Sequence, residues 1–346
     1  MIKSFREEER NIMKIAVVGL GYWGPNLVRN LYESNVCEQL YCCDTDQAKV
    51  AKIESRYPTI ITTTDHKDLV QNPEIDGAVI ATPVSTHYPL AMEFLGAGKH
   101  VFVEKPFTPS PDEGAKLVAL AEEKKRIVMV GHTFEYSPPV IKIKDIIDSG
   151  ELGKIYYISA SRVNLGLHQK DVSVIWDLAP HDFSCLFYWL DEQPTRLSAM
   201  GRDYVLKGIP DVAFINMEFA SGCTAHVQVS WLAPSKLRRT AIIGSDKMLV
   251  YDDTDAMEKV KIYDKGVDYK DPETFGEFQL SYRAGDIVSP RLDTFEPLNR
   301  EMRHFVECCE KGLTPKTDGH NGLRVVKALD AAERSLRGGG KIVEIA

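Results

Sequence analysis

The amino-acid sequence predicts an α/β protein in which a doubly wound parallel sheet is followed by an α+β domain with a large open sheet, mixed or antiparallel. From residue 13 to 133, short apolar segments alternate with amphipathic ones, as in parallel strands covered by helices on both faces. From 134 to 346, longer segments alternate apolar and polar residues, as in strands with one buried face. Residues 1–12 form a mixed-charge extension before the first strand.

The elements of the first domain follow from this alternation. Strands are predicted at Lys14–Gly19, Cys37–Cys43, Gly77–Ala81, His100–Val103 and Ile127–Val130. Helices are predicted at Tyr22–Glu33, Asp46–Arg56, Thr86–Leu95 and Pro111–Lys125. Asp44 or Thr45 is expected to cap the second of these helices. The last one opens with Ser110 as a cap, a proline at the first helical position and two early acids.

The second domain is expected to begin with a helix over Ser137–Asp148. Strands are then predicted at Lys154–Val163, Thr195–Tyr204, Ala213–Phe219, Cys223–Trp231, Arg238–Ile243 and Met248–Tyr251. Residues 265–296 are rich in Gly, Asp, Pro and Tyr, so an irregular segment is expected there. Two helices, Leu298–Lys311 and Gly319–Arg337, and a short strand at Lys341–Ile345 close the chain.

Composition narrows the class of protein. The chain has 346 residues and a net charge of −8, which argues against a protein whose main task is to bind nucleic acid. No apolar run approaches the ~20 residues of a membrane span, and the first ten residues lack the apolar core of a secretory signal. The seven cysteines show no Cys-x-x-Cys spacing, which predicts buried thiols in a cytoplasmic protein and no metal site.

A glycine motif, Gly19-Leu20-Gly21-Tyr22-Trp23-Gly24, follows the first predicted strand and opens the first predicted helix. In this context the motif predicts a Rossmann domain, in which the turn and the helix N-terminus bind the pyrophosphate of a dinucleotide. Asp44 lies 20 residues after Gly24, where a carboxylate accepts the ribose hydroxyls and repels a 2′-phosphate. With Thr45 beside it, this residue favours NAD over NADP. The alternatives are a turn that needs glycines and a plain helix cap.

Two further motifs carry candidate chemistry. Glu104-Lys105-Pro106 directly follows a predicted strand, at the carboxyl edge where doubly wound sheets bind ligands. Asp177 and His181 are four residues apart, so they share a helix face, and Pro180 predicts that this helix begins near Asp177. A histidine there can accept a proton from an alcohol. The alternatives are a solvated turn for Lys105, and a helix cap and an ordinary half-buried histidine for the second pair.

Together, the three motifs resemble the glucose–fructose oxidoreductase / inositol dehydrogenase (Gfo/Idh/MocA) family. The resemblance implies an N-terminal Rossmann domain and a C-terminal domain with a large open sheet. It also implies that Lys105 and His181 are the catalytic pair, with Asp177 beside them. The segment Ala81-Thr82-Pro83, with His87 downstream, matches the family segment that lines the cofactor, and Glu104 is grouped with it.

A finer resemblance concerns the substrate. Ser230–Lys236, Gly244–Met248 and Phe295–Leu298 resemble members that oxidise the 3-hydroxyl of UDP-linked N-acetylglucosamine or its uronic acid. Basic side chains of the second domain could bind the diphosphate of such a substrate, or they could be ordinary exposed charges of the protein surface. The residues assigned to substrate binding are Arg162, Asn164, Lys236, Arg238, Tyr282 and Arg283.

The resulting hypothesis is an NAD-dependent oxidoreductase that acts on a secondary hydroxyl of a nucleotide-linked sugar. His181 is the general base in oxidation, Lys105 polarises the reacting oxygen or relays its proton, and Asp177 orients. The alternatives are a free-sugar or cyclitol dehydrogenase and a non-catalytic NAD-dependent sensor. Since an open sheet face normally needs covering, a homodimer or homotetramer through the C-terminal sheet is expected.

Overall fold

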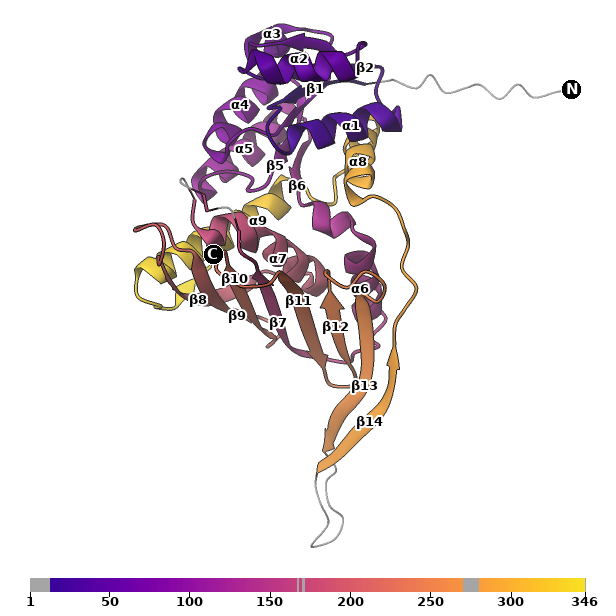
Figure 1. The fold of residues 1–346 in the computed structure, drawn as a ribbon, viewed down its shortest axis with the longest axis vertical. Coiled ribbons are helices and arrows are strands. Elements are labelled where there is room, and N and C mark those ends of the chain that lie inside the picture. Colours follow the sequence, from indigo (N-terminus) through magenta and orange to yellow (C-terminus); the bar gives the residue numbers. More distant parts are fainter. Residues whose placement is uncertain (1–12, 167, 170–171, 270–279, 346) are drawn as a thin grey trace, which may run out of the picture. The chain divides into compact units, whose positions relative to one another are not determined.

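A computed structural model describes residues 13–166, 168–169, 172–269 and 280–345 and divides into two compact units (Figure 1). Among the described residues, unit 1 comprises those up to Thr133 together with Glu296–Leu323, and unit 2 comprises those from Phe134 to Phe295 and from Arg324 onward.

Unit 1 contains six parallel strands in the order β3-β2-β1-β4-β5-β6, which confirms the predicted doubly wound sheet. The strands are β1 (Lys14–Val18), β2 (Gln39–Cys43), β3 (Ile61–Thr63), β4 (Gly77–Ile80), β5 (His100–Glu104) and β6 (Val128–Gly131). The sequence analysis missed β3 and the helix α3 (His66–Gln71) that follows it. Strand β3 is three residues long and none of them is buried, so it lacks the apolar run that revealed the others.

The other helices of unit 1 are α1 (Gly24–Ser34), α2 (Gln47–Arg56), α4 (Val84–Gly96), α5 (Pro111–Lys124) and α8 (Pro297–Lys311). Helix α1 begins two residues later than predicted. The cap of α2 is Asp46, whose side chain accepts the N–H of Ala48, so the prediction of Asp44 or Thr45 as this cap was wrong. The predicted cap of α5 is confirmed, because the Ser110 hydroxyl accepts the N–H of Glu113 at 3.3 Å.

The segment 296–323 was predicted in the second domain, but it clusters with unit 1. Helix α8 lies beside α1 although the two are far apart in sequence (Figure 1). The rings of Phe305 and Phe102 pack edge to face at 5.7 Å, and the Thr317 hydroxyl donates to the Val130 carbonyl at 2.8 Å. Residues distant in sequence thus complete the apolar cover of this sheet. The pattern of apolar residues within one segment cannot reveal such a contact.

Unit 2 contains a nine-stranded sheet in the order β14-β13-β12-β11-β7-β10-β9-β8-β15. It is mixed, because β7 and β10 are parallel while the other neighbours are antiparallel. Its strands are β7 (Ile155–Val163), β8 (Pro194–Arg202), β9 (Val212–Phe219), β10 (Thr224–Ser230), β11 (Leu237–Gly244), β12 (Met248–Asp252), β13 (Val260–Tyr269), β14 (Leu280–Val288) and β15 (Val343–Glu344).

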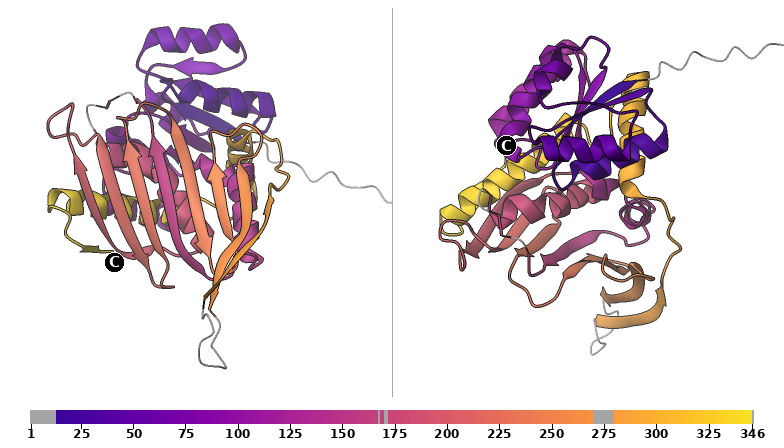
Figure 2. Two further views of the ribbon diagram at one scale, coloured as in Figure 1. Left: turned by 60° about the horizontal axis from the view of Figure 1, so that its bottom comes forward. Right: turned by 45° about the horizontal axis from the view of Figure 1, so that its top comes forward.

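Helices α6 (Pro138–Asp148), α7 (Val174–Leu190) and α9 (Gly319–Arg337) follow the prediction except for the start of α7. In unit 2, helices cover one face of the sheet, and Figure 2 (left) shows the other face toward the viewer. The core lies between this sheet and α7, where Phe183, Phe187 and Trp189 are buried. None of the helices in the described ranges is long and apolar enough to cross a membrane.

The expectation that residues 265–296 are irregular was wrong for 265–269 and 280–288, which lie in strands, and is confirmed for 289–296. Residues 270–279 lie outside the described residues. Strands β13 and β14 pair antiparallel, and β14 forms one edge of the sheet. The side chains of Val267, Tyr282 and Ile287 are about half exposed or more. Because these strands bury little, their sequence lacks the apolar alternation on which the prediction depended.

The predicted start of α7 near Asp177 was also wrong, because the helix begins at Val174 and Pro180 lies inside it. A proline there removes the helical hydrogen bond to the carbonyl of residue 176. Helix α7 buries Ile175, Phe183 and Phe187, among other residues, in the core of unit 2. Tertiary burial therefore outweighs the local cost of the proline.

Candidate functional site

The glycine turn between β1 and α1 needs its first and third glycines for packing. Gly19 has a φ of +98°, and a Cβ there would lie 2.5 Å from the Ala81 carbonyl oxygen. A Cβ on Gly24 would lie 1.9 Å from the carbonyl oxygen of Gly19. A Cβ on Gly21, by contrast, would meet no atom of the described residues within 4 Å. The turn is therefore tight on the protein side and open at its second glycine, which fits a backbone approached by a ligand.

Tyr22 and Trp23 follow on the same turn. The Tyr22 side chain is 93% exposed, and the two rings stack with their centroids 6.5 Å apart. Both side chains are exposed at the N-terminus of α1, where the cofactor contact is predicted.

Asp44 ties the end of β2 to the glycine turn. Its carboxylate accepts the N–H of Leu20 at 2.7 Å and the N–H of Asp46 at 2.9 Å. Burial opposes its ionisation, but these backbone donors and Lys49 outweigh burial and lower the pKa of Asp44. The Lys49 ammonium lies 3.4 Å from the Asp44 carboxylate. Asp44 therefore orders the glycine turn, and Thr45 follows it directly.

His87 fixes the Lys105–Pro106 turn rather than facing outward. Its ring is buried, with Nδ1 2.9 Å from the Pro106 carbonyl and Nε2 2.9 Å from the Thr82 carbonyl. Burial lowers the pKa of His87, although the contacts with the two carbonyls oppose the shift, and a neutral ring donates to one of these carbonyls at a time. This contact joins the turn after β4, which contains Thr82 and Pro83, to the turn after β5, where the Lys105–Pro106 peptide is cis.

Glu104 and His132 flank Lys105 at the carboxyl edge of the sheet. Burial raises the pKa of Glu104 to about 7, although Lys105 opposes the shift. Burial, reinforced by the charge of Lys105, lowers the pKa of His132 to about 3. Gly131 makes room for the Glu104 carboxyl group, since a Cβ there would lie 3.0 Å from it. The sequence analysis missed His132, which follows β6 directly.

In unit 2, α7 presents Asp177 and His181 on one face. The indole N–H of Trp231 donates to an Asp177 carboxylate oxygen at 3.0 Å. The ring of Phe134 packs against the His181 ring at 4.9 Å, and the Arg162 guanidinium lies 4.8 Å from the Phe134 ring centre. Each candidate on α7 is thus held by an aromatic side chain from another element.

Arg162 was predicted to bind substrate, but it forms a buried bidentate ion pair with Asp182. The Nε–Oδ2 distance is 2.7 Å and the Nη2–Oδ1 distance is 3.1 Å. Burial works against its charge, and Asp182 outweighs burial and raises the pKa of Arg162. Its structural partner is therefore the residue that follows His181.

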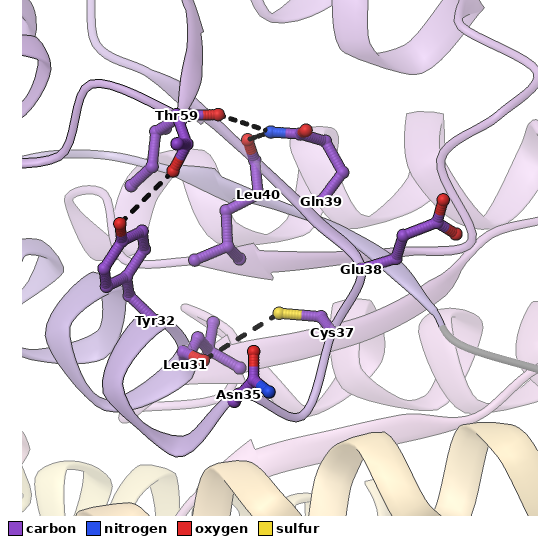
Figure 3. Close-up of a pocket in the computed structure, with 9 residues that line it drawn as sticks. Leu31, Tyr32, Asn35, Cys37, Glu38, Gln39, Leu40 and Thr59 are labelled. Carbon is purple, nitrogen blue, oxygen red and sulfur yellow. Dashed lines mark hydrogen bonds between the residues drawn. The ribbon is translucent and has the colours of Figure 1, made fainter. Parts of the chain in front are cut away.

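A cavity of about 270 Å³ lies at the opposite edge of the unit 1 sheet (Figure 3). It is lined by Leu31, Tyr32, Asn35, Cys37, Glu38, Gln39, Leu40, Thr59 and Ile60. Strand β2 begins there, whereas ligands of doubly wound sheets bind at the carboxyl ends of strands. Burial raises the pKa of Cys37 to about 12, so its thiol is not a reactive nucleophile.

Comparison with known families agrees with this geometry. Residues 13–132 match an oxidoreductase family with an NAD-binding Rossmann fold, and residues 140–250 match the C-terminal domain of the same family, GFO/IDH/MocA. The chain belongs to the Gfo/Idh/MocA family. Unit 1 therefore contains the NAD-binding domain of this oxidoreductase, and the predicted family, fold and cofactor are confirmed.

Individual relatives within the Gfo/Idh/MocA family differ in what they act on. Scyllo-inositol 2-dehydrogenase (NAD⁺) of Bacillus subtilis is 26% identical over 94% of this chain and 95% of its own. UDP-N-acetylglucosamine 3-dehydrogenase of Acidithiobacillus ferrooxidans is 28% identical over 50% of this chain and 54% of its own. The crystal structure of GenD2 from gentamicin A biosynthesis in complex with NAD superposes with a TM-score of 0.81 at 22% identity, covering 97% of each chain.

In this Gfo/Idh/MocA chain, the remaining residues predicted to bind substrate have diverse surroundings. Arg238 pairs with Asp253 at 3.4 Å, and Arg283 pairs with Asp264 at 2.8 Å. Lys236 and Tyr282 are exposed, and Asn164 is half-buried after β7. Among the residues that the structure describes, no group of three or more His, Cys, Asp or Glu could hold a metal ion.

Proposed function

We propose that the protein is an NAD-dependent dehydrogenase that oxidises a secondary hydroxyl of a sugar or polyol, and that its substrate is a nucleotide-linked sugar. The observation that carries this proposal is the pairing of Asp177 with His181 on one face of α7, each held by an aromatic side chain. A cofactor-binding sensor has no need of a fixed proton acceptor. The family accounts for hydride chemistry, and these side chains account for the proton.

The roles of the residues follow from their chemistry. When bound, NAD supplies the hydride acceptor. His181 takes the hydroxyl proton as a hydride leaves the carbon that carries this hydroxyl. Asp177 orients substrate or imidazole, and Lys105 donates a hydrogen bond to the oxygen as its charge develops. The cofactor is proposed to bind against residues of unit 1 that follow its strands: Gly21, Tyr22, Trp23, Asp44, Thr45, Thr82 and Pro83.

Fewer observations support the choice of a nucleotide-linked sugar as the substrate. The UDP-N-acetylglucosamine 3-dehydrogenase relative supports it, and the inositol dehydrogenase relative supports the alternative of a free polyol. Lys236 offers a solvent-exposed cation for a diphosphate, whereas Arg162, Arg238 and Arg283 already have carboxylate partners. We therefore assign Lys236, with Asn164 and Tyr282, the leading part in binding substrate.

An absorbance assay of nicotinamide reduction tests the proposal. UDP-N-acetylglucosamine and its uronic acid should be oxidised, and free inositol and glucose should be poor substrates. Lys236→Ala should raise KM for the UDP-sugar, while Lys207→Ala, another exposed lysine of unit 2, should leave it unchanged. Efficient oxidation of inositol with none of the UDP-sugars would establish the alternative instead.

We also propose that a second copy of this chain covers the open face of the unit 2 sheet. Paired positions on β8 and β9 place Met200 and Phe214 side by side on that face, 67% and 41% exposed. Exposed apolar side chains on a broad sheet favour an interface. Light scattering should give a dimer or tetramer, and Phe214→Glu should shift it toward monomer. A monomeric wild-type protein would exclude this arrangement.

A further inference from the structure

We propose that Trp231 is a positioning residue for Asp177, fixing the orientation of the carboxylate during catalysis. The inference rests on the proposed function, since it gives Trp231 a part in the reaction assigned to Asp177. Its starting point is the hydrogen bond of 3.0 Å from the indole nitrogen to Oδ2 of Asp177.

The Trp231 side chain is held firmly. It directly follows β10, is 1% exposed, and its backbone N–H donates to the Asp211 carbonyl at 2.9 Å. Its carbonyl accepts the N–H of Gly166 at 3.0 Å, and a Cβ on Gly166 would lie 2.8 Å from the indole ring. The His168 ring packs against it at 5.3 Å. An indole fixed in this way presents its N–H in one direction.

The chemistry of the donor suits a positioning role. An indole N–H donates and cannot accept, so it favours the ionised carboxylate and leaves Asp177 an acceptor. An aspartate on a half-exposed helix face can otherwise adopt several side-chain rotamers. The bond to Trp231 selects among them, and a hydrogen bond to a charged group typically contributes ~1.5–3 kcal/mol.

Unit 2 offers a matched control in Trp189. This residue is also buried, 2% exposed, and its indole N–H donates to the Val140 carbonyl at 3.0 Å. Trp231→Phe and Trp189→Phe therefore each remove one buried indole hydrogen bond and leave an aromatic ring. Both should lower the melting temperature to a similar extent, and only Trp231→Phe should affect catalysis.

The experiment measures kcat and KM of wild type, Trp231→Phe and Trp189→Phe with the best alcohol substrate, and repeats Trp231→Phe in an Asp177→Asn background. Trp231→Phe should lower kcat about 10- to 100-fold and leave KM for NAD unchanged. In the Asp177→Asn background it should have little further effect, because replacing the carboxylate by an amide already removes the charge-assisted hydrogen bond. A loss no larger than that of Trp189→Phe, or an equal loss in the Asp177→Asn background, would overturn the proposal.

A spectroscopic measurement separates this inference from the proposed function. In ¹H–¹⁵N spectra, Asp177→Asn should shift the indole resonance of Trp231 and leave that of Trp189 in place. If wild type oxidises no alcohol, the proposed function fails, and this shift alone decides whether Trp231 orients Asp177. An unchanged Trp231 resonance in Asp177→Asn would overturn the inference. This measurement does not require the Trp231→Phe variant, so it decides the question even if that variant does not fold.

Discussion

The two units hold their candidate residues by different means. In unit 1, side chains bind backbone groups of turns: the Asp44 carboxylate ties the end of β2 to the glycine turn, and the His87 ring ties the turn after β4 to the Lys105 turn. In unit 2, side chains fix the site: Trp231 holds Asp177, and Phe134 packs His181 while Arg162 pairs with Asp182. Turns leave a signature in sequence, and side-chain networks across a sheet do not.

The difference also bears on tolerance to change. A turn that depends on glycine fails through steric clash, which is local. A network of buried donors and charges fails because a partner is left unsatisfied inside the protein. Each prediction below tests one side of this contrast.

The largest expected effect is on turnover. Lys105→Ala and His181→Ala should each lower kcat by about 10²–10⁴-fold, the usual loss of a proton-transfer group. Since both are proposed to act on the same hydroxyl group, the double variant should lose far less than the product of the two. Wild-type oxidation should slow at acid pH, because a protonated imidazole cannot accept a proton. Near-normal turnover of either single variant would remove that residue from the mechanism.

Breaking the buried ion pair should cost the most stability in unit 2. Asp182→Asn leaves the Arg162 charge buried without its carboxylate, which typically costs ~3–5 kcal/mol of unfolding free energy. Glu218→Gln breaks the exposed pair with Arg196 and should cost at most ~1 kcal/mol. Urea unfolding of the three proteins measures both, and equal effects would mean that burial of Arg162 is unimportant.

Glu104 should make unit 1 sensitive to pH. Its folded pKa of about 7 lies above the ordinary value of 4.5, so its contribution to stability is complete below pH 4.5 and is lost as pH rises through 7. The shift corresponds to at most ~3 kcal/mol. Glu104→Gln should remove this part of the decline between pH 5 and 8, measured by urea unfolding. Glu122→Gln, at an exposed site, should behave like wild type, and a decline in Glu104→Gln as steep as in wild type would refute the assignment.

The smallest expected effect on stability is that of Gly21→Val, which contrasts with Gly24→Val in the same turn. Gly24→Val places a side chain against the Gly19 carbonyl and should cost ~1–3 kcal/mol or more of unfolding free energy. Gly21→Val points into open space, so stability should change by less than ~0.5 kcal/mol while NAD binding is lost. Circular dichroism and NAD titration check both, and normal NAD binding by Gly21→Val would place the cofactor elsewhere.

The sequence by itself determined the elements whose causes are local. Buried apolar runs revealed five strands of unit 1, and Gly19–Gly24 marked the turn because only glycine tolerates its backbone and contacts. The spacing of Asp177 and His181 placed them on one helix face, and alternation revealed most strands of unit 2. These features depend on residues close together in the chain, so a single sequence suffices to read them.

The tertiary structure alone decided features that depend on distant residues. Because α7 is buried, the helix extends through Pro180. Strands β13 and β14 form by pairing with each other, although their sequence lacks the alternation of apolar and polar residues. Arg162 became the buried partner of Asp182, Glu296–Leu323 joined unit 1, and Trp231 reached Asp177 across 54 positions of the chain. In each case the energy comes from burial or pairing between segments far apart in sequence, and that pairing exists only once the chain has folded.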